Sequence, residues 1–245
     1  MTTANKGQSG DSQLYWVADN VIAADFPPVS SALRDPDGLL AIGGDLSPDR
    51  LLDAYARGIF PWYSKGQPIL WWSPNPRCVL ELDDLKVSRS LRKTLRKGIF
   101  RVTLNQDFAG VISACADARW GSTETWITKE MFHAYTKLHN LGYAISVECW
   151  YEERLMGGLY GVVMGGVFFG ESMFSRKSDA SKVALVHLVE LLKTRNFRLI
   201  DCQVHSRHLQ SLGAKPIPRN LFVNILRHYC TGEHAHDWPV ESVLE

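Results

Sequence analysis

The clearest pattern of apolar and polar positions spans residues 166–204. A short aromatic and apolar run over 166–174 predicts a buried strand. Ser178 or Asp179 then offers a helix cap, and valines and leucines follow at helical spacing. A second apolar run, over 199–204, predicts another buried strand. The segment therefore predicts a strand, a helix that is covered on most sides, and a second strand.

Polar residues interrupt both of these apolar strands. Asp201 and Gln203 lie two residues apart, so in a regular strand they point to the same face. Glu171 interrupts the other strand. Because a buried polar group costs free energy unless it is hydrogen-bonded, one interpretation is a structural pair bound to nearby backbone. The second carboxylate favours another interpretation, a polar cleft in which Asp201 handles a proton and Gln203 orients it.

The rest of the chain predicts further strands and helices. Strands are expected at 100–104, 144–151 and 155–164, with a hairpin turn at Gly165-Gly166. Helices are expected at 108–118, 129–141, 205–212 and 221–228. The order from residue 100 is β-α-α-β-β-β-α-β-α, which indicates an α+β fold with a mixed sheet flanked by helices. This order resembles the GNAT fold of the N-acetyltransferase superfamily.

The GNAT resemblance carries a test of the acyl donor. Members of that superfamily hold the pyrophosphate of coenzyme A on a glycine-rich turn before the long helix. Residues 175–182 read SRKSDASK here and contain no glycine. The resemblance therefore predicts a fold without predicting coenzyme A as the donor.

Composition narrows the class of protein. The 245 residues are 45% hydrophobic and carry a formal net charge of +1, so any nucleic-acid contact needs a local basic patch. No apolar run approaches the roughly 20 residues of a membrane span, and the polar start differs from a secretory signal. Five scattered cysteines without CxxC spacing indicate reduced thiols in a cytoplasmic protein. His205 and His208 lack further ligands at metal spacing, so we expect no metal site.

The pattern also predicts how the chain divides. We expect a disordered tail over 1–20, a small N-terminal α/β domain over 21–78, a catalytic domain over 79–230 and a loose tail over 231–245. The small domain packs many aromatic residues into 59–72, either as a core or as a surface that stacks bases.

A basic helix is predicted near the start of the second domain. Five cations recur at spacings of three and four, namely Arg89, Arg92, Lys93, Arg96 and Lys97. A solvated helix face is the commonest meaning of such a run. Few acidic residues interrupt it, so contact with nucleic-acid phosphates is a second hypothesis.

Long segments resemble one bacterial family, the leucyl/phenylalanyl-tRNA–protein transferases. They are GLLAIGGDLSPDRLLDAYARGIFPWYS, ILWWSPNPR, ETWIT, GGLYGVVMGGVFFGESMFSRKSDASK and LIDCQVHSRHLQSLGAKPIPR. The resemblance implies a small N-terminal domain and a GNAT-like domain that transfers leucine or phenylalanine, less readily methionine, from aminoacyl-tRNA. The implied acceptors are proteins that begin with Arg or Lys, and the products enter the N-degron route. No cofactor is implied, and we expect a monomer.

The resemblance also assigns roles to residues. Asp201 would accept or relay the amine proton, oriented by Gln203, and Glu171 would hold the acceptor. An apolar aminoacyl pocket would comprise Leu159, Phe168, Met173, Leu188 and Ile200. Trp62 and Trp126 would flank the terminal adenosine of the tRNA, supported by Tyr55 and Phe60. The basic helix would meet the phosphates of the acceptor stem.

Three other functions fit parts of the sequence. An acyl-CoA-dependent N-acetyltransferase shares the fold and Glu171, but the glycine-rich turn is missing. A peptidoglycan-type aminoacyl transferase would share the donor and differ in the acceptor. A non-catalytic RNA-binding module would leave Asp201 and Gln203 unexplained.

Overall fold

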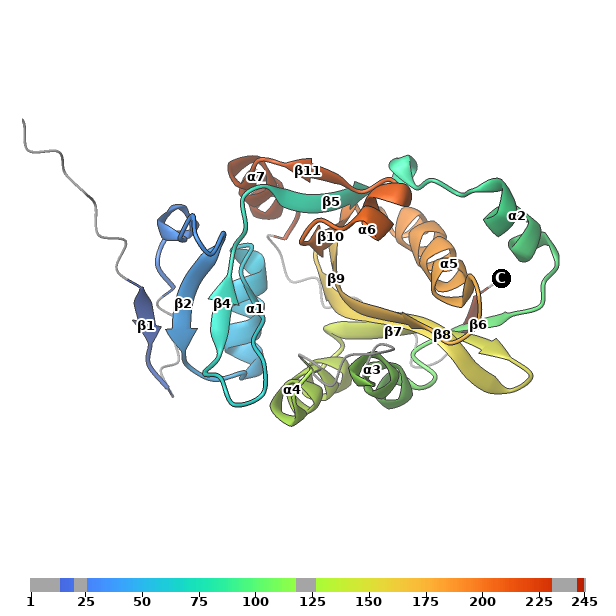
Figure 1. Cartoon of the computed structure of the whole chain (residues 1–245), viewed down its shortest axis with the longest axis horizontal. Coiled ribbons are helices and arrows are strands. Elements are labelled where there is room, and N and C mark those ends of the chain that lie inside the picture. The colour runs from blue at the N-terminus through green and yellow to red at the C-terminus, as the bar shows by residue number, and fades with distance from the viewer. Residues whose placement is uncertain (1–13, 20–25, 118–126, 231–241, 245) are drawn as a thin grey trace, which may run out of the picture.

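The computed structural model describes residues 14–19, 26–117, 127–230 and 242–244, which form two sheets (Figure 1). The smaller sheet has the order β1-β2-β4-β3 and belongs to the N-terminal part of the chain. Its strands are β1 (Tyr15–Val17), β2 (Leu39–Gly43), β3 (Phe60–Pro61) and β4 (Leu70–Trp72). A short 3-10 turn, η1 (Val29–Ser31), precedes β2.

Helix α1 (Pro48–Ala56) connects β2 to β3. It begins after Ser47 with proline at its first position, where the missing N–H would have no partner within the helix. Its buried face includes Leu51, Ala54 and Tyr55. This face turns the helix towards the second, larger part of the molecule, which is how Tyr55 reaches the site described below.

The larger sheet has eight strands in the order β11-β5-β10-β9-β8-β7-β6-β12. They are β5 (Arg77–Glu81), β6 (Arg101–Leu104), β7 (Ala144–Tyr151), β8 (Arg154–Met164), β9 (Val167–Ser175), β10 (Leu199–Gln203), β11 (Lys215–Ile217) and β12 (Ser242–Leu244). Strands β9 and β10 pair in parallel, and the other neighbours pair antiparallel. The sheet is therefore mixed, as the sequence predicts.

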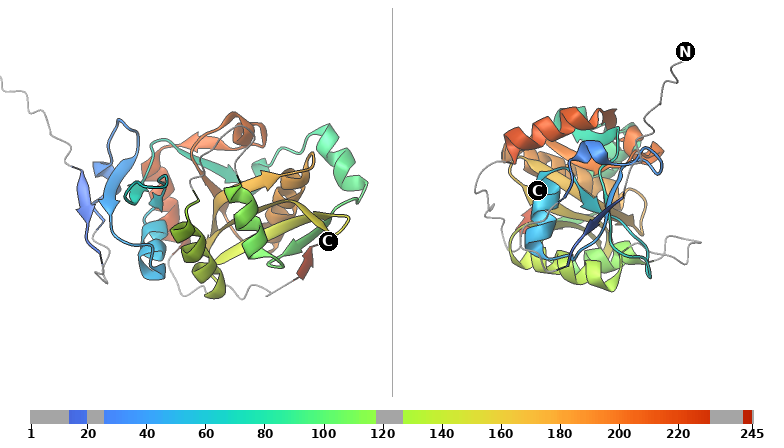
Figure 2. Two further views of the ribbon diagram at one scale, coloured as in Figure 1. Left: turned by 60° about the horizontal axis from the view of Figure 1, so that its bottom comes forward. Right: turned by 90° about the vertical axis from the view of Figure 1, so that its left-hand side faces the viewer.

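Helices cover both faces of this sheet (Figure 2). They are α2 (Arg89–Arg96), α3 (Phe108–Ala116), α4 (Lys129–Asn140), α5 (Ala180–Thr194), α6 (Arg207–Ser211) and α7 (Arg219–Tyr229), with a 3-10 turn η2 (Leu82–Asp84). Helices α3 and α4 lie on one face and α5 on the other (Figure 1). Gly157 lets α5 cross β8 closely, since a Cβ there would lie 2.5 Å from the Cβ of Ala180.

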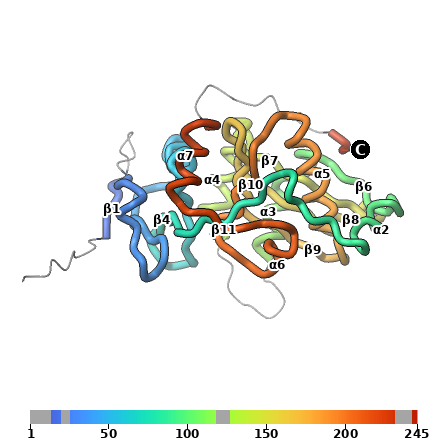
Figure 3. Tube along the Cα trace, turned by 90° about the horizontal axis from the view of Figure 1, so that it is seen from above, coloured from blue at the N-terminus to red at the C-terminus, as the bar shows by residue number. Residues whose placement is uncertain are grey.

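The N-terminal part packs directly against the larger sheet. One hydrophobic cluster contains Tyr55 and Trp71 from the smaller part together with Phe169 and Phe222 from the larger part. Helix α7 lies at this junction (Figure 3), where the ring of Phe222 approaches Gly58. The cluster therefore runs across the predicted domain boundary at residue 78.

The central parallel pair separates before its strands end. The pairing of β10 with β9 stops at Asp201 and Phe169, after which β9 continues beside β8 alone. Both strands bulge just beyond this point. On β10 the bulge lies between Asp201 and Gln203. On β9 it lies at Glu171, between the partners of Tyr160 and Gly161 of β8. Bulges of this kind redirect side chains and are frequent beside active sites.

The observed elements confirm the predicted α+β class and correct two details. Tyr15–Val17 pair in parallel with β2, so the predicted disordered tail over 1–20 is wrong for these residues. Ser242–Leu244 pair with β6, which likewise corrects the loose tail over 231–245. Strands of three residues are too short to show an alternating pattern. None of the helices that the structure describes is long and apolar enough to cross a membrane. The five cysteines all lie in the described ranges and form no disulfide there.

Candidate active site

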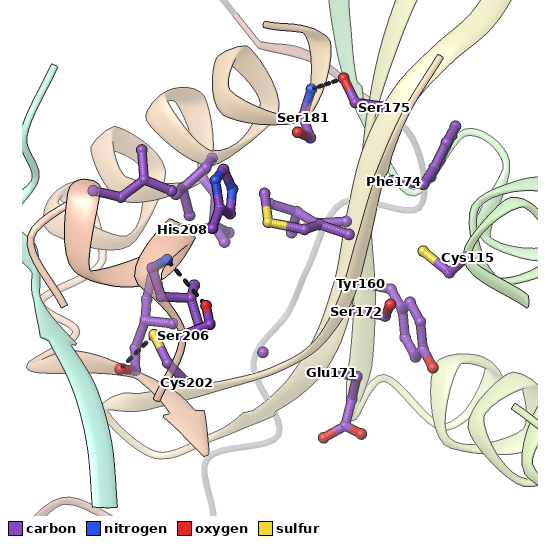
Figure 4. A pocket seen from close by; sticks show the side chains of 18 of the residues that line it. Cys115, Tyr160, Glu171, Ser172, Phe174, Ser175, Ser181, Cys202, Ser206 and His208 are labelled. Atoms are coloured by element: carbon purple, nitrogen blue, oxygen red, sulfur yellow. Dashed lines mark hydrogen bonds between the residues drawn. The ribbon is translucent and has the colours of Figure 1, made fainter. Parts of the chain in front are cut away.

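A cavity of about 1020 Å³ opens where β9 and β10 separate (Figure 4). Its lining includes Glu171, Asp201 and Gln203, the three polar residues predicted for the site. The predicted aminoacyl pocket lines the same cavity through Leu159, Phe168, Met173, Leu188 and Ile200. Four of these five side chains are at most 5% exposed, so they present an apolar wall. The structure thus brings together the polar and apolar residues that the sequence predicts.

Asp201 is fully buried and is paired with an arginine from the neighbouring strand. Arg77 Nε donates to one carboxylate oxygen at 2.8 Å, and Nη2 donates to the other at 2.7 Å. The guanidinium also donates to the carbonyl of Gly58 and lies 4.7 Å from the ring centroids of Phe60 and Phe222. A forked, aromatic-flanked arginine of this kind compensates a buried carboxylate and fixes its orientation.

Gln203 adopts a left-handed backbone conformation, with φ of 60°. Such a conformation is uncommon for a residue other than glycine, and it persists where the surroundings hold the backbone in place. Its backbone N–H donates to Asp201 Oδ1 at 2.9 Å, and its side-chain amide donates to Glu171 Oε1 at 2.8 Å. The expected orientation of the Asp201 carboxylate by the Gln203 side chain is therefore wrong, because the bulge turns the amide towards Glu171.

Glu171 lies in the bulge of β9, and its carboxylate accepts three hydrogen bonds. Tyr55 donates to Oε1 at 2.7 Å and Tyr135 to Oε2 at 2.9 Å, and the amide of Gln203 completes the set. Burial, the largest effect, raises the pKa of Glu171 to about 7, although these three hydrogen bonds lower it. A carboxyl group with this pKa changes protonation near neutral pH, as a proton acceptor in catalysis must.

The tyrosines around Glu171 act as neutral donors. Burial, followed by the charge of Glu171, raises the pKa of Tyr55 and of Tyr135 well above the ordinary value. Both hydroxyls therefore stay protonated at neutral pH. Tyr55 comes from α1 and Tyr135 from α4, so both parts of the chain contribute to holding this carboxylate.

The described residues predicted for the terminal adenosine differ in exposure. Trp62 is 43% exposed and leans on Trp72, with ring centroids 5.8 Å apart, so it can offer a face to a base. Tyr55 and Phe60 are buried, so they offer no ring face to a base, and their supporting role stays a prediction. Trp126 lies outside the described residues.

The basic helix is solvent-exposed at all five predicted positions. They are Arg89, Arg92, Lys93, Arg96 and Lys97, on α2 and just beyond it. Across the described ranges, no carboxylate lies within ion-pair distance of any of them. Figure 1 places α2 towards one end of the long axis and β4 towards the other, with β9 and β10 between them.

Comparison with known proteins shows to which family the chain belongs. Residues 79–227 match the family model described as leucyl/phenylalanyl-tRNA protein transferase, and residues 44–75 match the model of its N-terminal domain. The chain belongs to the leucyl/phenylalanyl-tRNA protein transferase family. It is therefore an enzyme of the aminoacyltransferase class.

Relatives that carry the name leucyl/phenylalanyl-tRNA–protein transferase match almost the full chain. One from Stutzerimonas stutzeri (strain A1501) is 57% identical over 213 residues, covering 87% of this chain and 94% of its own. One from Pseudomonas syringae pv. syringae (strain B728a) is 54% identical over 230 residues, covering 94% of this chain and 100% of its own.

Solved structures give much looser matches. A GCN5-related N-acetyltransferase from Kribbella flavida has 12% identity and a TM-score of 0.37, covering 65% of this chain and 56% of its own. L-PGS from Bacillus licheniformis has 11% identity and a TM-score of 0.39, covering 80% of this chain and 61% of its own. Matches at this level carry no information about the substrate of the transferase.

Sequence reasoning misses two residues of the site, Arg77 and Tyr135. Arg77 is a fully buried cation at the start of an apolar strand, and this charge is the signal that could have identified it. Tyr135 lies at helical spacing from Met131 and Leu138, which are also buried. Its pattern is therefore that of an ordinary core residue.

Proposed function

We propose that this transferase moves leucine or phenylalanine, and less readily methionine, from aminoacyl-tRNA to the N-terminal α-amine of a protein in the cytoplasm. The preferred acceptors begin with Arg or Lys, and the product is directed to the N-degron route. The observation that carries the proposal is a cavity that combines an apolar wall with Glu171, a buried carboxyl group whose pKa is about 7. Family membership supports the donor and the reaction class.

The apolar wall suits the aminoacyl side chain. Leu159, Phe168 and Ile200 are almost completely buried, and Met173 and Leu188 complete the slot. An apolar slot distinguishes ligands mainly by size and shape, with one methylene changing the free energy by about 1–3 kcal/mol. Leucine, phenylalanine and methionine have apolar side chains without a branch at Cβ. We expect such a slot to accept these three most readily.

The reaction needs activation of the acceptor more than of the donor. The α-ammonium of the acceptor, with an ordinary pKa of about 7.7–8.0, first loses a proton, and the resulting amine attacks the ester carbonyl. The C–O bond to the ribose then breaks as the amide C–N bond forms. A second amine proton ends on the ribose oxygen, so that the tRNA leaves with a free hydroxyl group.

We assign Glu171 as the group that receives the ammonium proton. It lines the cavity and ionises near neutral pH, so a carboxylate is available next to the cationic acceptor. Asp201 is fully buried, and Arg77 and the N–H of Gln203 occupy its oxygens. In this proposal Asp201 is a positioning residue that holds Gln203, and Gln203 in turn orients Glu171.

A transfer assay tests the function. The enzyme is incubated with radiolabelled leucyl-tRNA or radiolabelled acetyl-CoA, together with a peptide that begins with Arg. Label is expected on the peptide N-terminus from leucyl-tRNA alone, and an N-acetylated copy of the same peptide serves as the blocked control. Label arriving from acetyl-CoA, or none from leucyl-tRNA, would exclude the proposal. Peptides beginning with Lys, Ala and Glu then measure the acceptor preference.

We also propose that the basic helix contacts tRNA phosphates. Each lost phosphate contact reduces the slope of log affinity against log salt by about 0.7–0.9. Arg92→Gln is therefore expected to reduce the slope for leucyl-tRNA by about this amount. Lys137→Gln, an exposed change on α4, is the matched control and is expected to leave the slope unchanged. Equal slopes for both variants would contradict a contact at Arg92.

A further inference from the structure

Two cysteines meet at the bulge of strand β10. Asp201 of this strand pairs with Val79 of β5. The next paired residue is Gln203, which pairs with Cys78, so Cys202 is the extra residue of the bulge and also lies opposite Cys78. Opposed residues of an antiparallel pair have Cα atoms about 4.5–5.5 Å apart, which is within the roughly 4.4–6.8 Å that a disulfide spans.

The two cysteine side chains lie on the same face of the sheet. Cys78 belongs to the hydrophobic cluster on the α5 side, and Cys202 packs against that cluster. Val79, the next residue of β5, belongs to the other cluster, as expected from the alternation of a strand. The two thiols also hydrogen-bond each other, and this contact lowers the pKa of Cys78. The two sulfur atoms are therefore neighbours in the folded protein.

Cys202 is the member of the pair that a small molecule can reach. It is half-buried and lies among the residues that line the cavity (Figure 4), whereas Cys78 is 1% exposed. A small oxidant in the cavity therefore meets Cys202 first, and Cys78 is placed to react with the oxidised sulfur. Disulfides of cytoplasmic proteins are usually transient and act in catalysis or in redox sensing.

We propose that Cys78 and Cys202 form a redox modification site, at which a hydroperoxide closes a disulfide that slows the transferase. With hydrogen peroxide, the sulfur of Cys202 attacks one oxygen, the O–O bond breaks, and the leaving hydroxide takes the thiol proton to form water. The sulfur of Cys78 then attacks the sulfenic sulfur of Cys202. The S–O bond breaks, and the second thiol proton leaves with the hydroxide as water. The two thiols are thereby oxidised by two electrons, which reduce one peroxide to two waters.

The disulfide acts on the active site through Gln203, the residue that follows Cys202. An S–S bond is about 2.05 Å long, whereas atoms in simple contact are roughly 3.5–4.0 Å apart, so closure draws the bulge towards β5. Gln203 donates the hydrogen bond of 2.8 Å that orients Glu171. A displacement of about 1 Å in an active site can lower the rate by about 10²-fold. This part of the inference rests on the proposed function, because it assigns Glu171 to the transfer reaction.

The first experiment detects the bond itself. The reduced protein is exposed to hydrogen peroxide, its remaining thiols are blocked with iodoacetamide, and it is digested without reduction. We expect two of the five thiols to disappear and a linked peptide to contain Cys78 and Cys202, with dithiothreitol restoring both thiols. Cys115→Ala, which removes another cysteine of the cavity lining, is the matched control and should give the same linked peptide.

The second experiment traps the intermediate with dimedone, which reacts with sulfenic acids. Cys78→Ala lacks the thiol that resolves the oxidised Cys202, so peroxide is expected to leave a sulfenic acid there. Labelling of Cys202 should therefore be about tenfold higher in Cys78→Ala than in the wild type. Equal labelling in the two proteins would overturn the assignment of Cys78 as the resolving thiol.

The third experiment measures the effect on transfer. The oxidised wild type is expected to have about a tenfold lower kcat for leucine transfer to an Arg-initiated peptide, with the KM for leucyl-tRNA unchanged. Dithiothreitol should restore the kcat. Oxidised Cys115→Ala, which keeps the pair, is expected to lose and regain its kcat in the same way.

The possible failures are distinguishable. If the reduced wild type transfers no leucine to any peptide, the proposed function fails, and the linked peptide still tests the disulfide. If no linked peptide forms, or if Cys202 is joined to other cysteines instead, the modification site is overturned. If the disulfide forms and the kcat stays at the reduced value, its effect on the transferase is overturned.

Discussion

Two carboxylates on neighbouring strands of this transferase differ sharply in how they are held. Asp201 on β10 is fully buried, and Glu171 on β9 is 8% exposed. Arg77 meets Asp201 with a fork of two charged hydrogen bonds. Glu171 instead receives hydroxyl groups from Tyr55 and Tyr135 and the amide of Gln203, all of which are neutral.

The difference shows how surroundings separate a structural carboxylate from a reactive one. A cation compensates the charge of Asp201 directly, so this group is suited to hold its neighbours in position. Neutral donors stabilise the charge of Glu171 less than burial disfavours it, and its pKa rises to about 7. The two groups therefore have distinct roles although they lie in one cavity.

The largest expected effect concerns the reactive carboxylate. Glu171→Gln removes the proton acceptor and is expected to lower turnover by about 10²–10⁴-fold, the usual contribution of general base catalysis. Turnover is measured with leucyl-tRNA and an Arg-initiated peptide, per folded enzyme. Glu148→Gln, which alters another fully buried carboxylate on β7, is the matched control and should keep its turnover. Near-normal turnover for Glu171→Gln would remove the distinction drawn above.

The next effect concerns the structural carboxylate. Arg77→Ala leaves Asp201 as an uncompensated buried charge and is expected to lower the free energy of unfolding by about 3–5 kcal/mol. Chemical denaturation measures the change. Arg198→Ala breaks an exposed ion pair with Glu81 and should cost about 0–1 kcal/mol, which makes it the control. A loss as small as that of the control would show that Asp201 does not depend on its cation.

The pH dependence of stability separates the two carboxylates further. The carboxyl of Glu171 has a pKa of about 7 in the folded protein, against 4.5 for an unperturbed glutamate. Because the folded state holds this proton more tightly, its contribution to stability is complete below pH 4.5 and is lost as pH rises through 7. The whole loss is on the order of 3 kcal/mol. Unfolding free energies of wild type and Glu171→Gln, measured between pH 5.5 and 8, should diverge accordingly, whereas parallel curves would refute the raised pKa.

The smallest effect sharpens the role of the neutral donors. The hydroxyl of Tyr55 lowers the pKa of Glu171, so Tyr55→Phe should raise that pKa further. The pH at which turnover reaches half its maximum is expected to move up by about one unit, equivalent to 1.4 kcal/mol. Tyr63→Phe is the control, since its hydroxyl bonds Thr128 instead. An unchanged pH profile for Tyr55→Phe would mean that its hydrogen bond is unimportant for the titration.

The sequence predicts the central elements and the cavity wall well. The strand, helix and strand that carry Glu171, Leu188 and Asp201 appear as β9, α5 and β10. Apolar periodicity determines which face of such elements is buried, and these elements then lie beside one another. The five residues predicted for the aminoacyl slot therefore line one cavity. Their role in binding leucine or phenylalanine stays a prediction.

The pattern of apolar and polar positions does not predict which groups hydrogen-bond Asp201 and Glu171. The assumption that Asp201 and Gln203 share a face requires regular alternation, and the bulge at Gln203 breaks it. Tyr55 and Tyr135 are separated by 80 positions, and their meeting at Glu171 depends on how α1 and α4 pack. Local patterns do not contain such long-range contacts.

The position of Arg77 in the sequence determines which fragments of this protein keep an intact site. The matched catalytic region begins at residue 79, two positions after the arginine that neutralises Asp201. A fragment that begins at residue 79 would keep Asp201 but lose its counter-ion Arg77 and also Tyr55 of α1. The minimal active piece therefore has to start upstream of α1, and the two halves are better regarded as one catalytic unit.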